Sequence, residues 1–164
     1  MASTYEPIAT NTLSVDTASV TFSSISSAYT DLVLVCSVKG STSGAYGQMR
    51  LNSDTGTNYS QTSVYGNGSS AGSARNSSVS WAYPAQNNNV DTTNFTSYII
   101  NFMNYTNTTT YKTMISRNGS AAYVTEALVT LWRSTSAINS ILFQLNLGNL
   151  AAGSTFTLYG IKAA

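Results

Sequence analysis

Short runs in which apolar and polar residues alternate fill most of this chain, and helical periodicity is hard to find in it. In one run, Tyr98, Ile100 and Phe102 share a face, as they would in a β-strand. Between residues 124 and 132 both faces are partly apolar, which indicates burial on each side, in a sandwich or against a neighbouring subunit. A short helix within Thr125–Leu131 is the alternative for that segment. The predicted strands are Ser19–Phe22, Leu32–Lys39, Gly47–Leu51, Ser60–Tyr65, Val79–Tyr83, Tyr98–Asn104, Tyr111–Ser116, Tyr123–Arg133, Ile138–Leu147 and Thr155–Ile161.

Turns rich in Gly and Asn separate these runs at intervals of about 10 to 15 residues, as at Lys39–Gly44 and Asn118–Gly119. This spacing predicts an all-β fold, an antiparallel β-sandwich of jelly-roll type with about eight to ten short strands. Two segments that are poor in bulky side chains, Gly66–Asn76 and Pro84–Asn94, are predicted to be long loops.

No break in composition divides the chain, so residues 13–164 are expected to form a single sandwich domain. Residues 1–12 are expected to form an N-terminal arm, in which Pro7 limits helix formation and removes one hydrogen-bond donor. The arm is the candidate for a strand or tail that lies on a neighbouring subunit.

The polar part of the chain is almost uncharged. It contains 26 Ser, 23 Thr and 16 Asn, against 13 residues that are Asp, Glu, Lys or Arg, and its net charge is +1. An ordinary domain is about a quarter charged. The cations are spread along the sequence, which argues against nucleic-acid binding, and no apolar stretch approaches the roughly 20 residues of a membrane span. Near-neutral proteins associate readily, so we expect a subunit that packs against its own copies or a larger assembly.

Few side chains in the sequence are suited to catalysis. The absence of His excludes Ser-His-Asp and Cys-His mechanisms and most zinc or copper sites. The motif Asp54-x-Gly56-x-Asn58 has a faint likeness to a calcium loop but lacks its other acids, and a hairpin turn is the preferred interpretation. Cys36 is interpreted as a small buried hydrophobic residue. We therefore predict a protein that is not an enzyme, with no catalytic residue, metal or cofactor. The open alternative is a glycosidase, which would require two acids that meet only in the fold.

Aromatic residues give the remaining indication of a binding site. Trp81 and Tyr83 alternate in a predicted strand between the two predicted loops, where they are candidates for contact with a partner or a glycan. Packing in the core or between subunits is the favoured explanation for both residues. Stacking on sugar rings is the alternative.

Several stretches, taken in order, make the chain resemble small structural proteins of tailed bacteriophages, particularly those of marine and cyanobacterial phages. The resemblance extends from about Tyr5 to Lys162, and Ser63–Asn94 is poorly matched. It implies a surface component of the virion: a capsid decoration (cement) protein, a head fibre or knob, or a tail or fibre piece. The stretches are Tyr5–Thr10, Val20–Ile25, Tyr29–Leu34, Leu51–Ser60 and Gly153–Lys162.

Among these roles, capsid decoration is favoured, because the sequence has neither coiled-coil heptads nor collagen-like repeats for a fibre. The expected partners are further copies of the chain, with a trimer as one option, and the major capsid protein. The expected location is the virion, assembled in the host cytoplasm. The alternative is a tail-fibre or adhesion module that binds other tail proteins or host-surface polysaccharide.

Overall fold

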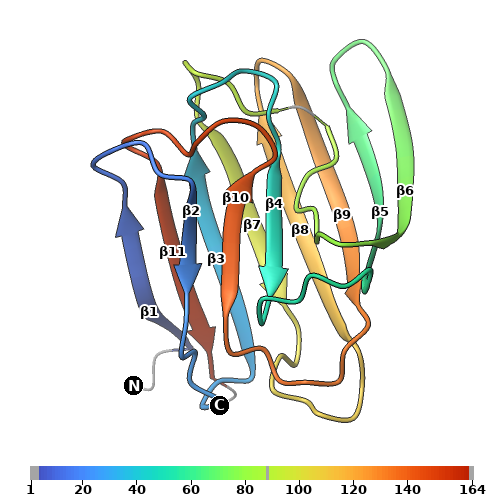
Figure 1. Ribbon diagram of the computed structural model, residues 1–164. Coiled ribbons are helices and arrows are strands. Elements are labelled where there is room, and N and C mark those ends of the chain that lie inside the picture. The colour runs from blue at the N-terminus through green and yellow to red at the C-terminus, as the bar shows by residue number, and fades with distance from the viewer. Residues whose placement is uncertain (1–3, 88, 163–164) are drawn as a thin grey trace.

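The computed structural model describes residues 4–87 and 89–162, which form two antiparallel β-sheets (Figure 1). This architecture confirms the predicted all-β sandwich, whereas a jelly-roll connectivity is not specifically confirmed by it. In the described residues no helix is long and apolar enough to cross a membrane. The strands are β1 (Tyr5–Thr12), β2 (Ser19–Phe22), β3 (Asp31–Val38), β4 (Gly47–Leu51), β5 (Tyr59–Gly66), β6 (Ala71–Val79), β7 (Thr96–Phe102), β8 (Lys112–Ser120), β9 (Val124–Trp132), β10 (Ile141–Leu145) and β11 (Thr155–Ile161).

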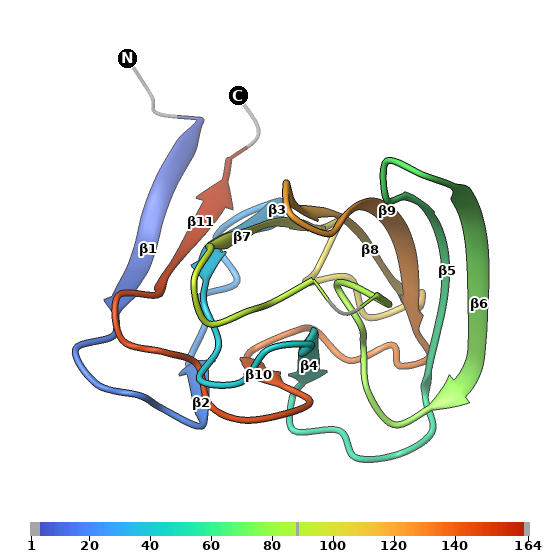
Figure 2. The ribbon, with the colours of Figure 1, turned by 90° about the horizontal axis from the view of Figure 1, so that it is seen from above.

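The two sheets differ greatly in size. The large sheet has eight strands in the order β1-β11-β3-β7-β8-β9-β5-β6, and the small sheet has three in the order β2-β10-β4. Figure 2 shows the large sheet curving around the small one, which lies on its concave side. One face of the large sheet is therefore covered, and none of the described residues forms a layer over its convex outer face.

The core lies between the small sheet and the concave face of the large sheet. The predicted shared face of Tyr98, Ile100 and Phe102 on β7 is confirmed, and it points into the core, since all three residues are fully buried. Tyr98 packs edge-on against Phe143 of the small sheet at a centroid distance of 5.5 Å, and Phe143 packs against Phe156 at 5.4 Å. The period of two along each strand thus fixes which residues face the small sheet.

Strand β9 replaces the helix considered for its central residues. Its even-numbered positions, from Val124 to Trp132, are buried, whereas Thr125, Ala127 and Val129 are exposed. Burial on both sides, one expectation for this segment, does not occur within the single chain. The second partly apolar face of β9 lies on the uncovered outer face of the large sheet.

Two predictions between residues 66 and 83 are wrong. The segment Gly66–Asn76 is not a long loop, because a tight turn at Asn67–Ser70 leads into strand β6. The segment Val79–Tyr83 is not a strand beyond its first residue, since only Ala82 pairs, in an isolated bridge with Met49. The loop at Pro84–Asn94 is confirmed, although it is packed into the fold and not extended into solvent.

The predicted N-terminal arm lies partly in the large sheet. Residues 5–12 form β1, which pairs with β11 of the same chain, with a register shift between Pro7 and Ala9. Residues 1–3 of the predicted arm lie outside the described residues.

Candidate interaction surfaces

Trp81 and Tyr83 lie on either side of Ala82, on the outer side of the small sheet. Ala82 accepts a hydrogen bond from the Met49 N–H at 2.8 Å and donates one to the Met49 carbonyl at 3.1 Å. Ala82 is fully buried, so its two neighbours point the other way and are partly exposed. The sequence prediction that these two aromatic residues share a face is met, but in a loop and not in a strand.

Each of these aromatic residues contacts a neighbour near β4. The Arg50 guanidinium lies over the Trp81 ring, 3.7 Å from its centroid, a cation–π contact. Tyr83 packs edge-on against Tyr46 at 5.6 Å. Burial and the neighbouring Tyr46 raise the pKa of Tyr83, although a hydrogen bond with the Gln48 side chain opposes the shift. We call Tyr46, Gln48, Arg50, Trp81 and Tyr83 the aromatic platform.

The aromatic platform joins ring faces to amide groups. Besides its bond to Tyr83, Gln48 accepts a hydrogen bond from the Gln144 amide at 3.4 Å. Partly exposed rings beside amides have the chemistry that stacks on sugars and binds hydroxyl groups. Arg50 already occupies one face of Trp81, so a ligand would use the other face or the ring edges.

A second surface, which sequence reasoning missed, is the outer face of the large sheet. Strand register aligns its outward side chains in cross-strand rows, one of which runs through Ile99, Arg117, Ala127 and Val64. Aliphatic side chains dominate the middle of this face, and their relative exposure is 42% for Ile115, 51% for Val129 and 59% for Val64. We call Val64, Ile99, Ile115, Ala127 and Val129, with Arg75 and Arg117, the aliphatic face.

The charges of the aliphatic face have one sign. Arg75 lies in the same row as Val129, and Arg117 lies between Ile99 and Ala127. Neither arginine forms an ion pair with any residue that the structure describes. The one ion pair among the described residues joins Glu6 and Lys162. An aliphatic surface with two unpaired guanidinium groups is complementary to a partner that presents aliphatic and carboxylate groups.

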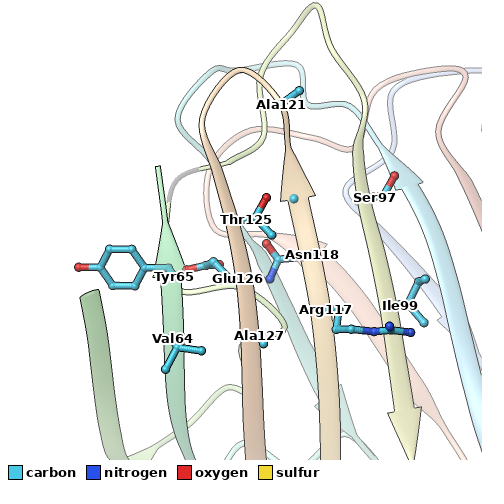
Figure 3. Close-up of a pocket in the computed structure, with 11 residues that line it drawn as sticks. Val64, Tyr65, Ser97, Ile99, Arg117, Asn118, Ala121, Thr125, Glu126 and Ala127 are labelled. Atoms are coloured by element: carbon cyan, nitrogen blue, oxygen red, sulfur yellow. The ribbon is translucent and has the colours of Figure 1, made fainter. Parts of the chain in front are cut away.

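A shallow hollow of about 720 Å³ lies at one end of the aliphatic face. It forms where a cross-strand row consists of small residues, Ser97, Gly119 and Thr125, beside the larger Ile99 and Val64. Figure 3 shows the side chains of this region on β5, β9, β8 and β7, with Arg117 extending across β7 towards Ile99. The hollow is suited to receive an apolar side chain of a partner protein.

Beneath the hollow, a buried carboxylate fastens the loop at Pro84–Asn94. Glu126, which is 2% exposed, accepts hydrogen bonds from the backbone N–H groups of Gln86 and Asn87, both at 3.1 Å. Asn118 donates to the Pro84 carbonyl at 2.7 Å from the next strand. The polar residues on the concave side of β8 and β9 therefore bind backbone, so this loop is held against the sheet.

The other residues considered for chemistry have structural contacts. Asp54 accepts hydrogen bonds from Gly56 N–H at 2.8 Å and from the Asn58 amide at 2.9 Å, so the segment is a turn. The predicted hairpin is wrong, because β4 and β5 on either side of this turn lie in different sheets. Cys36 is 2% exposed, and burial raises the pKa of its thiol. In residues 4–87 and 89–162, no three His, Cys, Asp or Glu side chains lie close enough to hold a metal ion.

No protein-family model matches the chain, and no curated protein matches it. The two surfaces described above, the aromatic platform and the aliphatic face, are therefore interpreted from their own chemistry.

Proposed function

We propose that the chain is a non-enzymatic structural subunit of a tailed-phage virion, a capsid decoration protein that docks through the aliphatic face. The resemblance of the sequence to phage structural proteins is the reason for choosing a virion among possible assemblies. The observation that carries the docking surface is the exposure of Ile115, Val129 and Val64 on the uncovered side of an eight-stranded sheet. Exposed apolar patches on a soluble fold mark sites of protein–protein contact.

The size and chemistry of the aliphatic face support docking on a protein surface. Complete burial of an aliphatic side chain contributes about 1.5–3 kcal/mol to stability. Ile115, Val129 and Val64 are about half exposed in the free chain, so docking can gain roughly half of this amount from each of them. A stable contact buries about 800 Å² on each partner, and strands β5 to β9 offer a continuous sheet surface. The major capsid protein would present aliphatic and acidic groups to Ile115, Val129, Arg75 and Arg117.

Docking of this kind stabilises a shell by mass action. A subunit that binds the assembled lattice and not its dissociated proteins lowers the free energy of the lattice by an amount set by its concentration and affinity. The neutral Ser, Thr and Asn surface suits close packing of many copies, because little charge repulsion opposes it. Such a subunit would bind through complementary shape and through hydrogen bonds of backbone and amide groups.

Immunogold labelling of intact particles of the phage that encodes the chain tests this proposal. Gold distributed over the head is the expected result. Gold confined to the tail would contradict decoration, and particles without gold, when antibody binding to the purified chain is intact, would contradict the virion assignment itself.

The aromatic platform supports a second candidate function, recognition of host-surface polysaccharide by a tail-fibre or adhesion module. The observation in its favour is that Trp81, Tyr83 and Tyr46 gather beside the amides of Gln48 and Gln144 on one surface. Binding of purified host polysaccharide, measured by calorimetry, should then fall at least tenfold in Trp81→Ala and Tyr83→Ala. Phe95→Ala, which changes an exposed aromatic residue elsewhere, is the control.

A further inference from the structure

Strand β6 is the last strand of the large sheet, and one edge of it is unpaired. Among the strands that the structure describes it pairs with β5 alone, and it is the outermost strand on its side of the molecule in both views (Figures 1 and 2). None of its nine residues is buried. The strand is therefore held mainly by its backbone bonds to β5, and Val79 at its end packs against the core.

The backbone groups that point away from β5 can be assigned from the hairpin. The Asn67 N–H donates to the Ser70 carbonyl at 3.1 Å, and pairing then continues through Gly66 with Ala71 and Tyr65 with Gly72. Because hydrogen-bonded and non-hydrogen-bonded pairs alternate in an antiparallel ladder, Gly72 and Ala74 bond to β5. The N–H and C=O groups of Ala71, Ser73 and Arg75 face the open edge.

The pairing of β5 with β9, on the other side of β5, gives the same assignment. Arg133 N–H donates to the Asn58 carbonyl at 2.8 Å, so the even-numbered residues of β5 bond to β9. The odd-numbered residues of β5 therefore bond to β6, up to the register shift between Tyr59 and Gln61. The two observations assign the same three residues of β6 to the open edge.

The first part of this edge, Ala71–Arg75, lacks the usual protection against pairing, whereas a register shift between Asn76 and Val79 interrupts the rest of the strand. Its sequence from Ala71 to Val79 contains no Pro and one charged residue, Arg75. The opposite edge of the sheet, β1, carries Pro7 and a register shift after it. Proteins commonly protect edge strands with Pro, charge or bulges. In β1 a Pro and a register shift lie near the start of the strand, whereas in β6 the regular stretch Ala71–Arg75 precedes the shift and its one charged residue is Arg75.

We infer that β6 pairs with β6 of a second copy, antiparallel and about a two-fold axis, which joins two eight-stranded sheets into one. This inference rests on the proposed structural role and names the surface used between copies. A pairing centred on Ala74 places Ser73 of each copy opposite Arg75 of the other. The outward N–H and C=O groups of Ser73 and Arg75 are then all hydrogen-bonded between the copies. In this register Arg75 does not lie opposite Arg75 of the second copy, so like charges are not directly opposed.

Two features of the chain favour a two-fold pair of copies. First, a head-to-tail contact from β6 to β1 of the next copy would meet Pro7 and the register shift, so the closed two-fold contact is preferred over an open chain of copies. Second, the net charge of +1 gives little repulsion between copies. Joining the sheets also brings two aliphatic faces side by side, so one shell surface would bind both with added avidity.

Sedimentation equilibrium of the purified full-length chain tests the inference with two substitutions at one position. Ser73→Pro removes an outward N–H and leaves the bonds to β5, whereas Ser73→Ala keeps that N–H and removes the hydroxyl. We expect a concentration-dependent dimer for the unchanged chain and for Ser73→Ala, and at least a tenfold weaker dimer for Ser73→Pro. A chain that stays monomeric up to about 1 mM, or a dimer that Ser73→Pro does not weaken, would overturn the inference.

A disulfide test does not depend on how Ser73→Pro folds. Ala74→Cys would place two thiols across the two-fold axis at a non-hydrogen-bonded pair, within the Cα separation that a disulfide needs. The native Cys36 is buried and does not compete. Mild oxidation should cross-link Ala74→Cys at least tenfold faster than the exposed-turn control Ser69→Cys; equal rates would overturn the predicted pairing.

The outcome can be separated from that of the proposed function. If the dimer forms as described but no gold labels the virion, the virion role fails and the pairing stands. If gold labels the head but Ser73→Pro has no effect on dimerisation, the pairing fails and the decoration role stands.

Discussion

The indole N–H of Trp132 donates a 2.7 Å hydrogen bond to the carboxylate of Asp54, and so joins the end of β9 to the turn between β4 and β5. Trp132 is 2% exposed and stacks on Tyr59, with ring centroids 6.4 Å apart. Burial by itself would raise the pKa of Asp54, but hydrogen bonds from Trp132, Asn58 and Gly56 hold it below its usual value.

Asp54→Asn should lower stability by about 1–2 kcal/mol at pH 7, because hydrogen bonds to a carboxylate are stronger than those to an amide. The folded-state pKa is lowered, so the stabilisation is present above the unfolded pKa of about 3.9 and is lost as pH falls through the folded value. Denaturation curves at pH 7 and pH 3 should show the difference between the two proteins shrinking at pH 3.

Trp132→Phe and the double variant provide the control for Asp54→Asn. If the bond between these two side chains carries the effect, the double variant loses less stability than the sum of the single variants. Strict additivity, or a difference that is constant between pH 7 and pH 3, would contradict the assignment.

Gln61→Met should raise stability by about 1 kcal/mol. Gln61 is 2% exposed, and both polar atoms of its side chain lack a hydrogen-bond partner among the described residues. Replacing an unsatisfied buried amide by an apolar side chain of similar length removes a desolvation cost. Thermal denaturation measures the gain.

Gln48→Met is the matched control for Gln61→Met. Because Gln48 hydrogen-bonds to Gln144 and Tyr83, the Gln48→Met variant should lose stability. A loss of stability in Gln61→Met would contradict the interpretation of Gln61 as an unsatisfied amide.

Glu126→Gln should release the loop at Pro84–Asn94 from the sheet. The carboxylate accepts from the backbone N–H groups of Gln86 and Asn87, and an amide supplies only one oxygen for them. We expect a loss of about 1–3 kcal/mol and faster hydrogen exchange at those two amides. Exchange at the two amides that stays as slow as in the unchanged protein would refute the role given to Glu126.

Gly160→Ala should destabilise the protein by more than about 1 kcal/mol, because the new methyl group would lie 2.3 Å from the Tyr29 ring. Gly66→Ala is the control, because a methyl group there meets only the Ser70 carbonyl oxygen, at 3.9 Å. Chemical denaturation of the two variants measures the difference. Equal stabilities would mean that Tyr29 moves aside without cost.

Some strands could be predicted because their side chains are buried on one face. The bounds of β2, β4 and β11 agree with the prediction, since apolar residues alternate along each of them. Strand β6 could not be found in this way, because most of its side chains are small and neutral and its backbone pairing with β5 defines it. Its sequence has the composition of a turn.

The candidate surfaces were predictable only in part. Trp81 and Tyr83 could be picked out by residue type, but their aromatic character suggested a strand where a single bridge at Ala82 exists. The aliphatic face could not be assigned, because β9 has two partly apolar faces and the sequence alone does not say which one the small sheet covers. That choice depends on contacts between strands that are far apart in the chain.

The most direct test of the proposed docking is binding of the purified chain to phage heads that lack it, measured by co-sedimentation. Val129→Asp places a carboxylate in the middle of the aliphatic face, and Thr21→Asp places the same group on the exposed side of β2. Both positions are exposed, so we expect both variants to fold with stabilities within about 0.5 kcal/mol of the unchanged chain. The account predicts that Val129→Asp loses binding at least tenfold while Thr21→Asp binds normally; equal binding by the two variants would contradict docking through the aliphatic face.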